Sequence, residues 1–414
     1  MAAPPVTIYV ARDMAALALG ANEVATSIER VAALRGLAVE IVRTGTRGLL
    51  WLEPMVEVAT AQGRIAYGPV AALDIDELFS ADFINGGEHS LRLGRTEDIP
   101  YLARQQRLTF ARCGVIDPFS FDEYCAQGGM IGMRKAAAMD AAAIVDEVKS
   151  SGLRGRGGAG FPAWIKWNAV RQADADKKYV VCNADEGDSG TFADRILMEG
   201  DPLTLIEGMA IAGLATGAAK GYIYLRSEYP QAFEALNRAL IVARRRGLLG
   251  ASVCGSGKAF DIEVRLGAGA YICGEETSLL ESLEGKRGVV RAKPPIPALK
   301  GLFGKPTLVN NVMSFAAIPW ILAHGGKAYA DYGMGRSLGT LPIQLAGNIK
   351  RGGLIEIAFG ATLREIIDGY GGGTLSGRPV RAVQVGGPLG AYFPEHMLDI
   401  PLDYEAFAAA KGLL

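Results

Sequence analysis

The sequence predicts an α/β multidomain protein built around a parallel sheet. Its central part alternates short apolar segments with helical ones, which is typical of a parallel sheet covered by helices. A glycine-rich loop at residues 154–162 precedes one of these helices. The chain has 414 residues, which is more than one hydrophobic core usually organises, and 50% of them are hydrophobic. About two to four domains are therefore expected.

Composition argues against several classes of function. Lys and Arg total 43 and Asp and Glu total 44, so the net charge of -1 gives no global attraction to nucleic acid or to a membrane surface. The longest weakly polar stretch, residues 208–225, contains four glycines and Lys220, and we expect no transmembrane helix. Residues 1–5 have neither a basic region nor an apolar core, so we predict a cytoplasmic protein without a secretory signal.

The cysteines indicate neither a disulfide framework nor a metal site. They are five in number and far apart, with no C-x-x-C spacing, so no iron-sulfur or zinc ligand set is recognisable. The three histidines are isolated in the sequence. We therefore expect no metal ligands in this chain.

The N-terminal elements predict a thioredoxin-like domain over residues 1–85. The expected order is a strand at 6–10, an alanine-rich helix at 16–35, strands at 39–42, 49–52 and 55–59, and a short helix at 74–79. Residues 85–97 are polar and contain glycine, which predicts a linker. Residues 86–150 as a whole are interpreted as this linker and a helical lead-in.

The glycine-rich loop predicts a phosphate site. Four of the six positions 155–160 are glycine, which tolerates positive φ and close approach of a ligand. Pro162 is expected to begin a helix, whose N-terminal amides and dipole suit an anion. The G-x-G-x-x-G spacing is not a dinucleotide fingerprint by itself, because residues 141–149 before it predict a helix rather than a strand. A tight helix-helix connection is the alternative.

Residues 151–335 are interpreted as a Rossmann-like α/β domain. Strands are expected at 179–182, 222–225 and 262–266, and helices at 202–215, 231–246 and 277–283, with Asp201 as an N-cap before Pro202. Ligands of parallel sheets lie beyond the carboxyl ends of the strands. Two acidic loops, 183–190 and 267–277, follow such ends. Either loop alone is explained by helix capping, but their convergence with the glycine-rich loop favours a binding site.

The last predicted domain covers residues 336–414. Strands are expected at 342–346, 354–358 and 380–385. Thr362 and Glu365 form a capping box for a helix at 363–368, which the glycines at 371–373 end. This order fits a β-grasp-like, soluble ligand-binding domain, and a generic small α+β domain is the alternative.

Several long motifs, in this order, resemble one flavoprotein family. They are S-G-L-R-G-R-G-G-A-G-F-P from Ser151, C-N-A-D-E from Cys182, G-A-G-A-Y-I-C-G-E-E-T from Gly267, K-P-P from Lys293 and N-N-V from Asn310. The family contains the NADH-oxidising subunit of respiratory complex I and the diaphorase subunits of NAD-linked formate dehydrogenases and hydrogenases. The resemblance covers roughly residues 98–410.

The resemblance implies that the chain binds FMN and NAD(H). The FMN residues implied are Gly155, Arg156, Gly157, Gly158, Lys166, Asn183, Asp185, Glu186, Tyr271, Gly274, Glu275, Asn310 and Asn311. The NAD(H) residues implied are Phe161, Asp188, Glu276 and Lys293. The flavin itself carries the hydride chemistry, so no catalytic acid or base is expected. Asp188 or Glu276 would also repel a ribose 2′-phosphate, favouring NAD over NADP.

The chain departs from the family pattern in three respects. Family members often have glutamate in place of Asp188 and an aromatic in place of Ile296 and Ala169, so the adenine pocket is expected to be looser. They also continue into a helical bundle whose cysteines bind a 4Fe-4S cluster. This chain ends at Leu414 without those ligands. It is therefore either a truncated form or a variant that transfers electrons without its own cluster.

The N-terminal domain resembles the cysteine-free thioredoxin-like extension on the beta subunit of soluble, molybdenum-type NAD-dependent formate dehydrogenase. This predicts a diaphorase subunit that passes electrons through FMN between NAD(H) and iron-sulfur partners, including a thioredoxin-like 2Fe-2S subunit. Formate would react in a separate molybdenum-containing subunit. The same flavoprotein in complex I or in an NAD-reducing hydrogenase is one alternative. A non-redox docking or scaffold protein with a vestigial flavin site is another.

Overall fold

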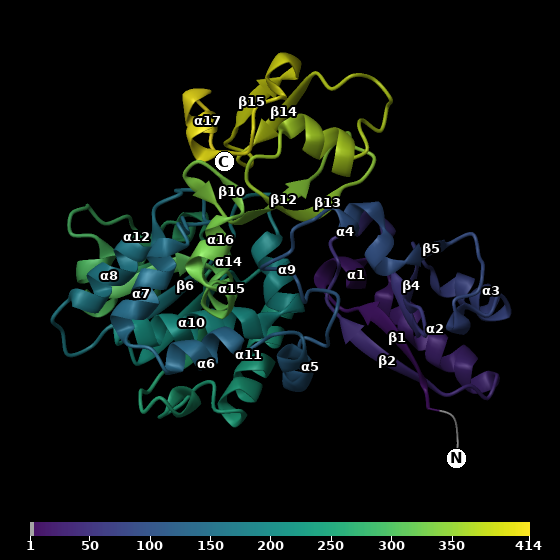
Figure 1. The fold of residues 1–414 in the computed structure, drawn as a ribbon, viewed down its shortest axis with the longest axis horizontal. Helices are drawn as coiled ribbons and strands as arrows, with labels where there is room; N and C mark the ends of the chain where they lie inside the picture. The colour runs from purple at the N-terminus through teal and green to yellow at the C-terminus, as the bar shows by residue number, and fades with distance from the viewer. Residues whose placement is uncertain (1–3) are drawn as a thin grey trace.

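The structure is a computed structural model that describes residues 4–414. Figure 1 shows an N-terminal part in purple, a central part in blue and teal, and a C-terminal part in yellow-green, all in contact. Residues 1–3, which belong to the predicted N-terminal domain and to the segment judged for a secretory signal, lie outside this description.

The N-terminal part is a mixed sheet of five strands in the order β2-β1-β3-β4-β5. The strands are β1 (Val6–Ala11), β2 (Val39–Thr44), β3 (Val56–Thr60), β4 (Gly63–Tyr67) and β5 (Arg92–Arg95). Only β1 and β2 pair in parallel within this sheet. The helices are α1 (Met14–Ala18), α2 (Ala21–Leu34) and α3 (Ile75–Ser80). Alternate residues such as Ile8 and Val10 of β1 are buried in the core of this part.

Besides β4, which was not predicted, three features of this part differ from the expectations. The helix expected at 16–35 is divided at Gly20, whose φ of 95° is outside the helical region. The strand expected at 49–52 is a 3₁₀ turn, Leu50–Leu52, because its apolar side chains pack against the core of the C-terminal part and not into the sheet. The expected linker contains β5, a polar edge strand that β4 holds through its backbone.

The predicted parallel sheet is confirmed in the central part. Its order is β8-β7-β6-β9, with β6 (Tyr179–Ala184), β7 (Lys220–Leu225), β8 (Asp261–Leu266) and β9 (Thr307–Asn311). The strand β9 and the helix α9 (Ala193–Gly200) were not predicted from the sequence. The helix α10 (Pro202–Thr216) is buried at all 15 positions, which agrees with its lack of a polar face.

The other helices before and around this sheet range from four to 16 residues in length. The lead-in consists of α4 (Pro100–Ala103), α5 (Phe121–Ala126), α6 (Ile131–Ala137) and α7 (Ala141–Ser150). The rest are α8 (Ala163–Gln172), α11 (Pro230–Arg245), α12 (Glu276–Leu283), α13 (Pro297–Lys300), α14 (Val312–Ala316), α15 (Ile318–His324) and α16 (Gly326–Ala330).

The C-terminal part consists of antiparallel pairs and two helical segments. The pairs join β10 (Gly333–Met334) to β11 (Ser337–Leu338), β12 (Thr340–Leu345) to β13 (Gly353–Ala358), and β14 (Ala382–Val385) to β15 (Ala391–Pro394). The helical segments are a π-helical stretch, Glu365–Tyr370, and α17 (Tyr404–Ala409). The predicted capping box is present, since Thr362 N donates to Glu365 Oε2 at 2.7 Å and Glu365 N donates to Thr362 Oγ1 at 3.1 Å.

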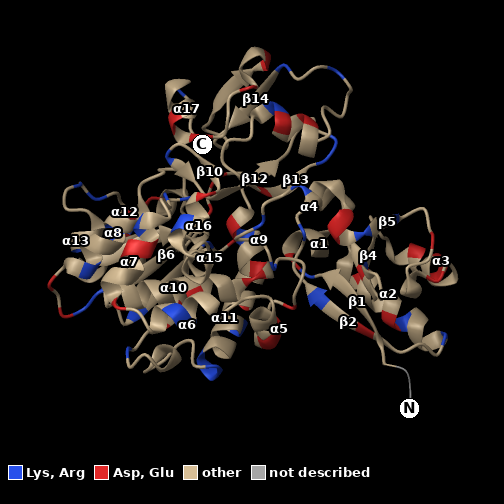
Figure 2. Ribbon diagram, in the orientation of Figure 1, with Lys and Arg blue, Asp and Glu red and all other residues tan. Residues whose placement is uncertain are grey.

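Charges of both signs are spread over all three parts of the molecule (Figure 2). Over residues 4–414, no helix is both long and apolar enough to cross a membrane.

Candidate functional site

The candidate site is built on the carboxyl ends of β6 and β9. These strands are parallel neighbours in which Asn183 lies opposite Asn311, and Cys182 lies opposite Asn310. Three predicted asparagines therefore gather at one edge of the sheet. Asn311 also caps α14, because its Oδ1 accepts from Ser314 N at 3.0 Å.

The glycine-rich loop lies over this edge. Arg156 N donates to Ser314 Oγ at 2.9 Å, which fastens the loop to the start of α14. A Cβ on Gly157 would lie only 3.2 Å from Asn311 Cβ, so the backbone approaches the edge more closely than a side chain permits. Gly158 has a φ of 94°, in the region that favours glycine. Pro162, predicted to begin the helix, is the N-cap of α8, which begins one position later at Ala163.

The side chain of Arg156 points away from this edge. Its guanidinium is partly buried and donates to Leu338 O at 2.8 Å, to Thr340 O at 3.1 Å and to Tyr329 Oη at 3.1 Å. Only the backbone of Arg156 is therefore available at the site, and its side chain fixes the loop to the C-terminal part.

The two predicted acidic loops meet at the same edge. Asn183 Nδ2 donates to Gly274 O at 2.8 Å, and Tyr271 Oη donates to Asp188 Oδ1 at 2.6 Å. The structure thus brings together three segments that are far apart in the sequence.

Two lysines and two glutamates form a charged network beside the loops. Lys166 Nζ lies 2.7 Å from Glu276 Oε2, and Lys293 Nζ lies 2.9 Å from Glu276 Oε1 and 3.0 Å from Glu275 Oε1. Burial opposes the ionisation of Glu275, but hydrogen bonds from Thr277, Ser278 and Lys293 outweigh it and lower the pKa to about 2. Glu275 is also the N-cap of α12.

Two neighbouring carboxylates in the 183–190 loop have different environments. Partial burial raises the pKa of Asp185 to about 6, although Arg226 opposes the shift. Glu186 is buried and accepts from Asp194 N at 3.0 Å, Arg195 N at 3.2 Å and Tyr229 Oη at 3.0 Å. Glu186 therefore holds the first turn of α9, and burial raises its pKa as well.

The arrangement fits FMN. Asn310 is buried, and its Oδ1 has no hydrogen-bond partner within the described part of the chain, 4–414. Such an orphaned acceptor suits a polar ligand atom that donates to it. The glycine loop supplies a backbone cradle that a Cβ at Gly157 would crowd. Phe161, at the end of the loop, is 44% exposed and can offer its ring to a second aromatic group.

Two residues at this edge were not predicted from the sequence. Asp194 is buried, and each of its carboxylate oxygens accepts a hydrogen bond from Asn311 Nδ2 at 3.3 Å. Burial raises its pKa well above the ordinary value, with Glu186 adding to the shift. Ser314 anchors the glycine loop. Both residues belong to short helices that were not predicted, α9 and α14, so position in the fold, not a sequence motif, reveals them.

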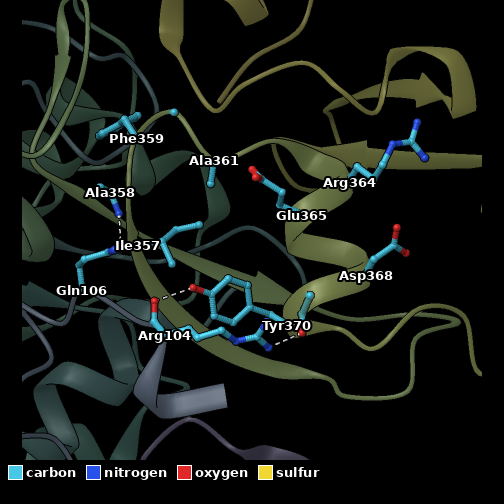
Figure 3. Close-up of a pocket in the computed structure, with 12 residues that line it drawn as sticks. Arg104, Gln106, Ile357, Ala358, Phe359, Ala361, Arg364, Glu365, Asp368 and Tyr370 are labelled. Atoms are coloured by element: carbon cyan, nitrogen blue, oxygen red, sulfur yellow. Dashed lines mark hydrogen bonds between the residues drawn. The ribbon is translucent and has the colours of Figure 1, made fainter. Parts of the chain in front are cut away.

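An open cavity of about 710 Å³ lies elsewhere, between the C-terminal part and residues 104–106 (Figure 3). Its polar groups are largely paired within the protein. Arg104 bonds to Pro100 O and Gly369 O, and Tyr370 Oη donates to Arg104 O at 2.8 Å. The cavity shares no lining residue with the predicted cofactor site.

Comparison with known proteins gives a consistent result. The model of the Nuo51 FMN-binding domain matches residues 148–320. An NADH-quinone oxidoreductase subunit of Rhizobium meliloti is 45% identical over 301 residues, 72% of each chain. The NADP-reducing hydrogenase subunit HndC of Solidesulfovibrio fructosivorans is 50% identical over 75% of this chain, which spans 63% of that subunit's length.

The chain is also similar to a solved structure of NAD+-reducing [NiFe]-hydrogenase in the air-oxidized state. The TM-score is 0.62 at 28% identity, over 100% of this chain and 68% of the other. The region matched by the FMN-binding model contains the glycine loop, both acidic loops and the asparagines of β9. The chain belongs to the family of NADH-binding FMN flavoproteins that includes this NADH-quinone oxidoreductase subunit of Rhizobium meliloti.

Proposed function

We propose that the chain is the flavin-bearing subunit of a multisubunit dehydrogenase and exchanges electrons with NAD(H). The observation that carries this proposal is the convergence of the glycine loop, the two acidic loops and the orphaned Asn310 Oδ1 at one sheet edge. Bound FMN would supply the conversion between a hydride from the nicotinamide and single electrons for a partner.

Specific residues have defined tasks in this proposal. The backbone of residues 155–158 and the asparagines of β9 would hold FMN. Lys166 is placed at the site by its ion pair with Glu276. Lys293 orients both Glu275 and Glu276 by pairing with each. Phe161, Asp188, Glu276 and Lys293 would contact NAD(H).

Visible absorbance tests the proposal. The purified full chain, loaded with FMN and freed of excess, should show the bands of oxidised flavin and lose them on anaerobic addition of NADH. A protein that retains no flavin contradicts the proposal and supports the docking or scaffold alternative. Retained flavin that NADH does not bleach would place the cofactor correctly but contradict the exchange with NAD(H).

Our finer proposal is the beta subunit of an NAD-dependent formate dehydrogenase, in the cytoplasm, with iron-sulfur partners and a separate molybdenum subunit. It is supported by the N-terminal part, which resembles the thioredoxin-like extension of that subunit and has no cysteine before Cys113. We also propose thioredoxin-like and β-grasp-like folds for the terminal parts. The similarity of the whole chain to an NAD+-reducing hydrogenase favours that complex as the second candidate.

Isolation of the native complex distinguishes these candidates. The chain is tagged in the organism that produces it and purified anaerobically with its partners. The resulting complex should reduce NAD⁺ with formate. Reduction of NAD⁺ with H₂ alone would instead assign it to a hydrogenase. Electron transfer from NADH to quinone alone would assign it to complex I.

A further inference from the structure

A side chain of the C-terminal part holds the loop that carries Asp185 and Asp188. Gln344 of β12 accepts from Phe192 N at 2.8 Å and from Ala193 N at 2.9 Å through its Oε1. Its Nε2 donates to Gly190 O at 2.9 Å. One amide thus makes three hydrogen bonds to the segment that joins β6 to α9.

These bonds replace a missing helix cap. The first four N–H groups of a helix have no partner within the helix. The N-cap of α9 is Phe192, whose side chain cannot accept a hydrogen bond. Gln344 takes the amides of Phe192 and Ala193, and Glu186 takes the next two, of Asp194 and Arg195. The start of α9 is therefore fixed by two side chains from outside the helix.

The hairpin β14–β15 approaches the same loop. Its turn contains Gly387, where a Cβ would lie 3.2 Å from Asp188 Oδ2. The φ of Gly387 is 75°. Ser189 and Gly190, at the tip of the loop, are exposed, so burial does little to fix this part of the loop. The C-terminal part contributes restraint at the tip, in addition to the bonds from Tyr229 to Thr191 O and from Tyr271 to Asp188.

We propose that Gln344 is a positioning residue for the dinucleotide site: it fixes residues 190–193, just after Asp188, and so sets the affinity for NAD(H) without touching the nucleotide. This inference rests on the proposed function, which places Asp188 against NAD(H). None of the three residues bonded to Gln344, Gly190, Phe192 and Ala193, is itself a predicted FMN contact.

Steady-state kinetics of the FMN-loaded full chain test this inference. Gln344→Met removes all three hydrogen bonds and should raise the KM for NADH by about tenfold, as expected when about 1.4 kcal/mol of loop restraint is lost. The kcat should change by less than about twofold, because the flavin contacts are intact. Gln344→Glu keeps the two accepted bonds at a helix N-terminus, where a carboxylate is favourable, and should restore KM to within about threefold of the parent.

A matched control uses another side-chain amide of the same part. Asn348 donates only to Ser376 Oγ at 3.3 Å, so Asn348→Leu should leave KM unchanged. An unchanged KM in Gln344→Met overturns the inference. The inference is also overturned if kcat and flavin content fall together with the rise in KM, because that result would indicate a merely structural role. Gln344→Asn, which is one methylene too short, replaces Gln344→Met if that variant does not fold.

Amide hydrogen exchange of the flavin-free chain gives a second readout. Gln344→Met should remove protection at Phe192 and Ala193, while the protection at Asp194 and Arg195 persists through Glu186. If the parent chain binds no flavin or does not oxidise NADH, the proposed function fails but this exchange pattern still tests Gln344. Retained protection at Phe192 and Ala193 would contradict the positioning role.

Discussion

Lys166 Nζ and Glu276 Oε2 lie 2.7 Å apart, joining α8 to the first residue of α12 across the site. This pair is partly buried, with 29% of the lysine side chain and 22% of the glutamate side chain exposed. Lys293 contacts the other oxygen of Glu276. The two lysines hold the pKa of Glu276 below its ordinary value against the effect of burial, so the carboxylate is ionised at neutral pH.

Replacement of Lys166 should weaken flavin binding. Lys166→Met removes a charged donor from the site, and loss of such a hydrogen bond costs about 1.5–3 kcal/mol, or roughly tenfold or more in the FMN dissociation constant. Titration of flavin fluorescence measures this constant. Lys305→Met is the control, because Lys305 pairs with Asp176 on the surface at 2.6 Å. Equal dissociation constants in the two variants would contradict the assignment of Lys166.

Titration of Asp185 should appear in the affinity for NADH. Its pKa of about 6 means that the side chain is neutral below that pH and negative above it. The negative form repels the phosphates of the dinucleotide, so the KM for NADH should rise as pH increases through about 6. The pH profile of kcat/KM checks this, and the step should vanish in Asp185→Asn. A step of the same size in that variant would assign the titration to another group.

Asp188 should determine the preference for NAD over NADP. Asp188→Asn removes the charge expected to repel a 2′-phosphate, and the kcat/KM for NADPH relative to NADH should rise by about tenfold. Tyr271→Phe is the matched variant, because it deletes the 2.6 Å hydrogen bond to Asp188 but leaves the carboxylate. It should leave the ratio near the parent value. An unchanged ratio in Asp188→Asn would remove this residue from specificity.

The junction between the N-terminal part and α9 should make stability depend on pH. Burial raises the pKa of Glu53 and of Glu199 to about 8, and the charge of Asp13 adds to both shifts. The folded protein therefore keeps protons that the unfolded chain releases above its ordinary carboxyl pKa of about 4.5. The free energy of unfolding should fall as pH rises from about 4.5 to 8 and then level off.

Denaturant unfolding at several pH values measures this dependence. Glu53→Gln and Glu199→Gln should each flatten the curve, since glutamine does not ionise. Glu40→Gln, at an exposed position, is the control and should follow the parent. A stability that rises between pH 5 and 8 would contradict the raised pKa values.

The sequence predicted the parallel sheet because β6, β7 and β8 are apolar runs separated by helices with clear caps, such as Asp201 before α10. It missed β9 because this strand follows the irregular segment 284–306, with no long helix to mark the alternation. It missed β4 because this short hairpin strand begins with Gly63 and Arg64, which do not favour a strand. Leu50–Leu52 was wrongly predicted as a strand because its apolar side chains pack against the core of the C-terminal part.

The site was predictable where the motif is contiguous and unpredictable where it depends on distant contacts. The three loops were identified from their own glycines and acids, and the structure places them together. Sequence alone could not show that the Arg156 guanidinium points to Leu338 and Thr340, or that Glu186 caps α9. Both side chains satisfy partners supplied by the tertiary fold.

Helix α9 lies between the N-terminal and C-terminal parts (Figure 1), and each of its ends is hydrogen-bonded to one of them. Gln344 binds its first amides, and Glu199 near its last turn accepts from Met14 N at 2.7 Å. The protein is thus poorly suited to dissection into independent modules. A fragment that ends before β12 would leave the amides of Phe192 and Ala193 without their acceptor Gln344. A fragment that begins after β5 would leave Glu199 without its donor, Met14 N. Any chimera that exchanges one terminal part must carry a replacement for the contact it removes.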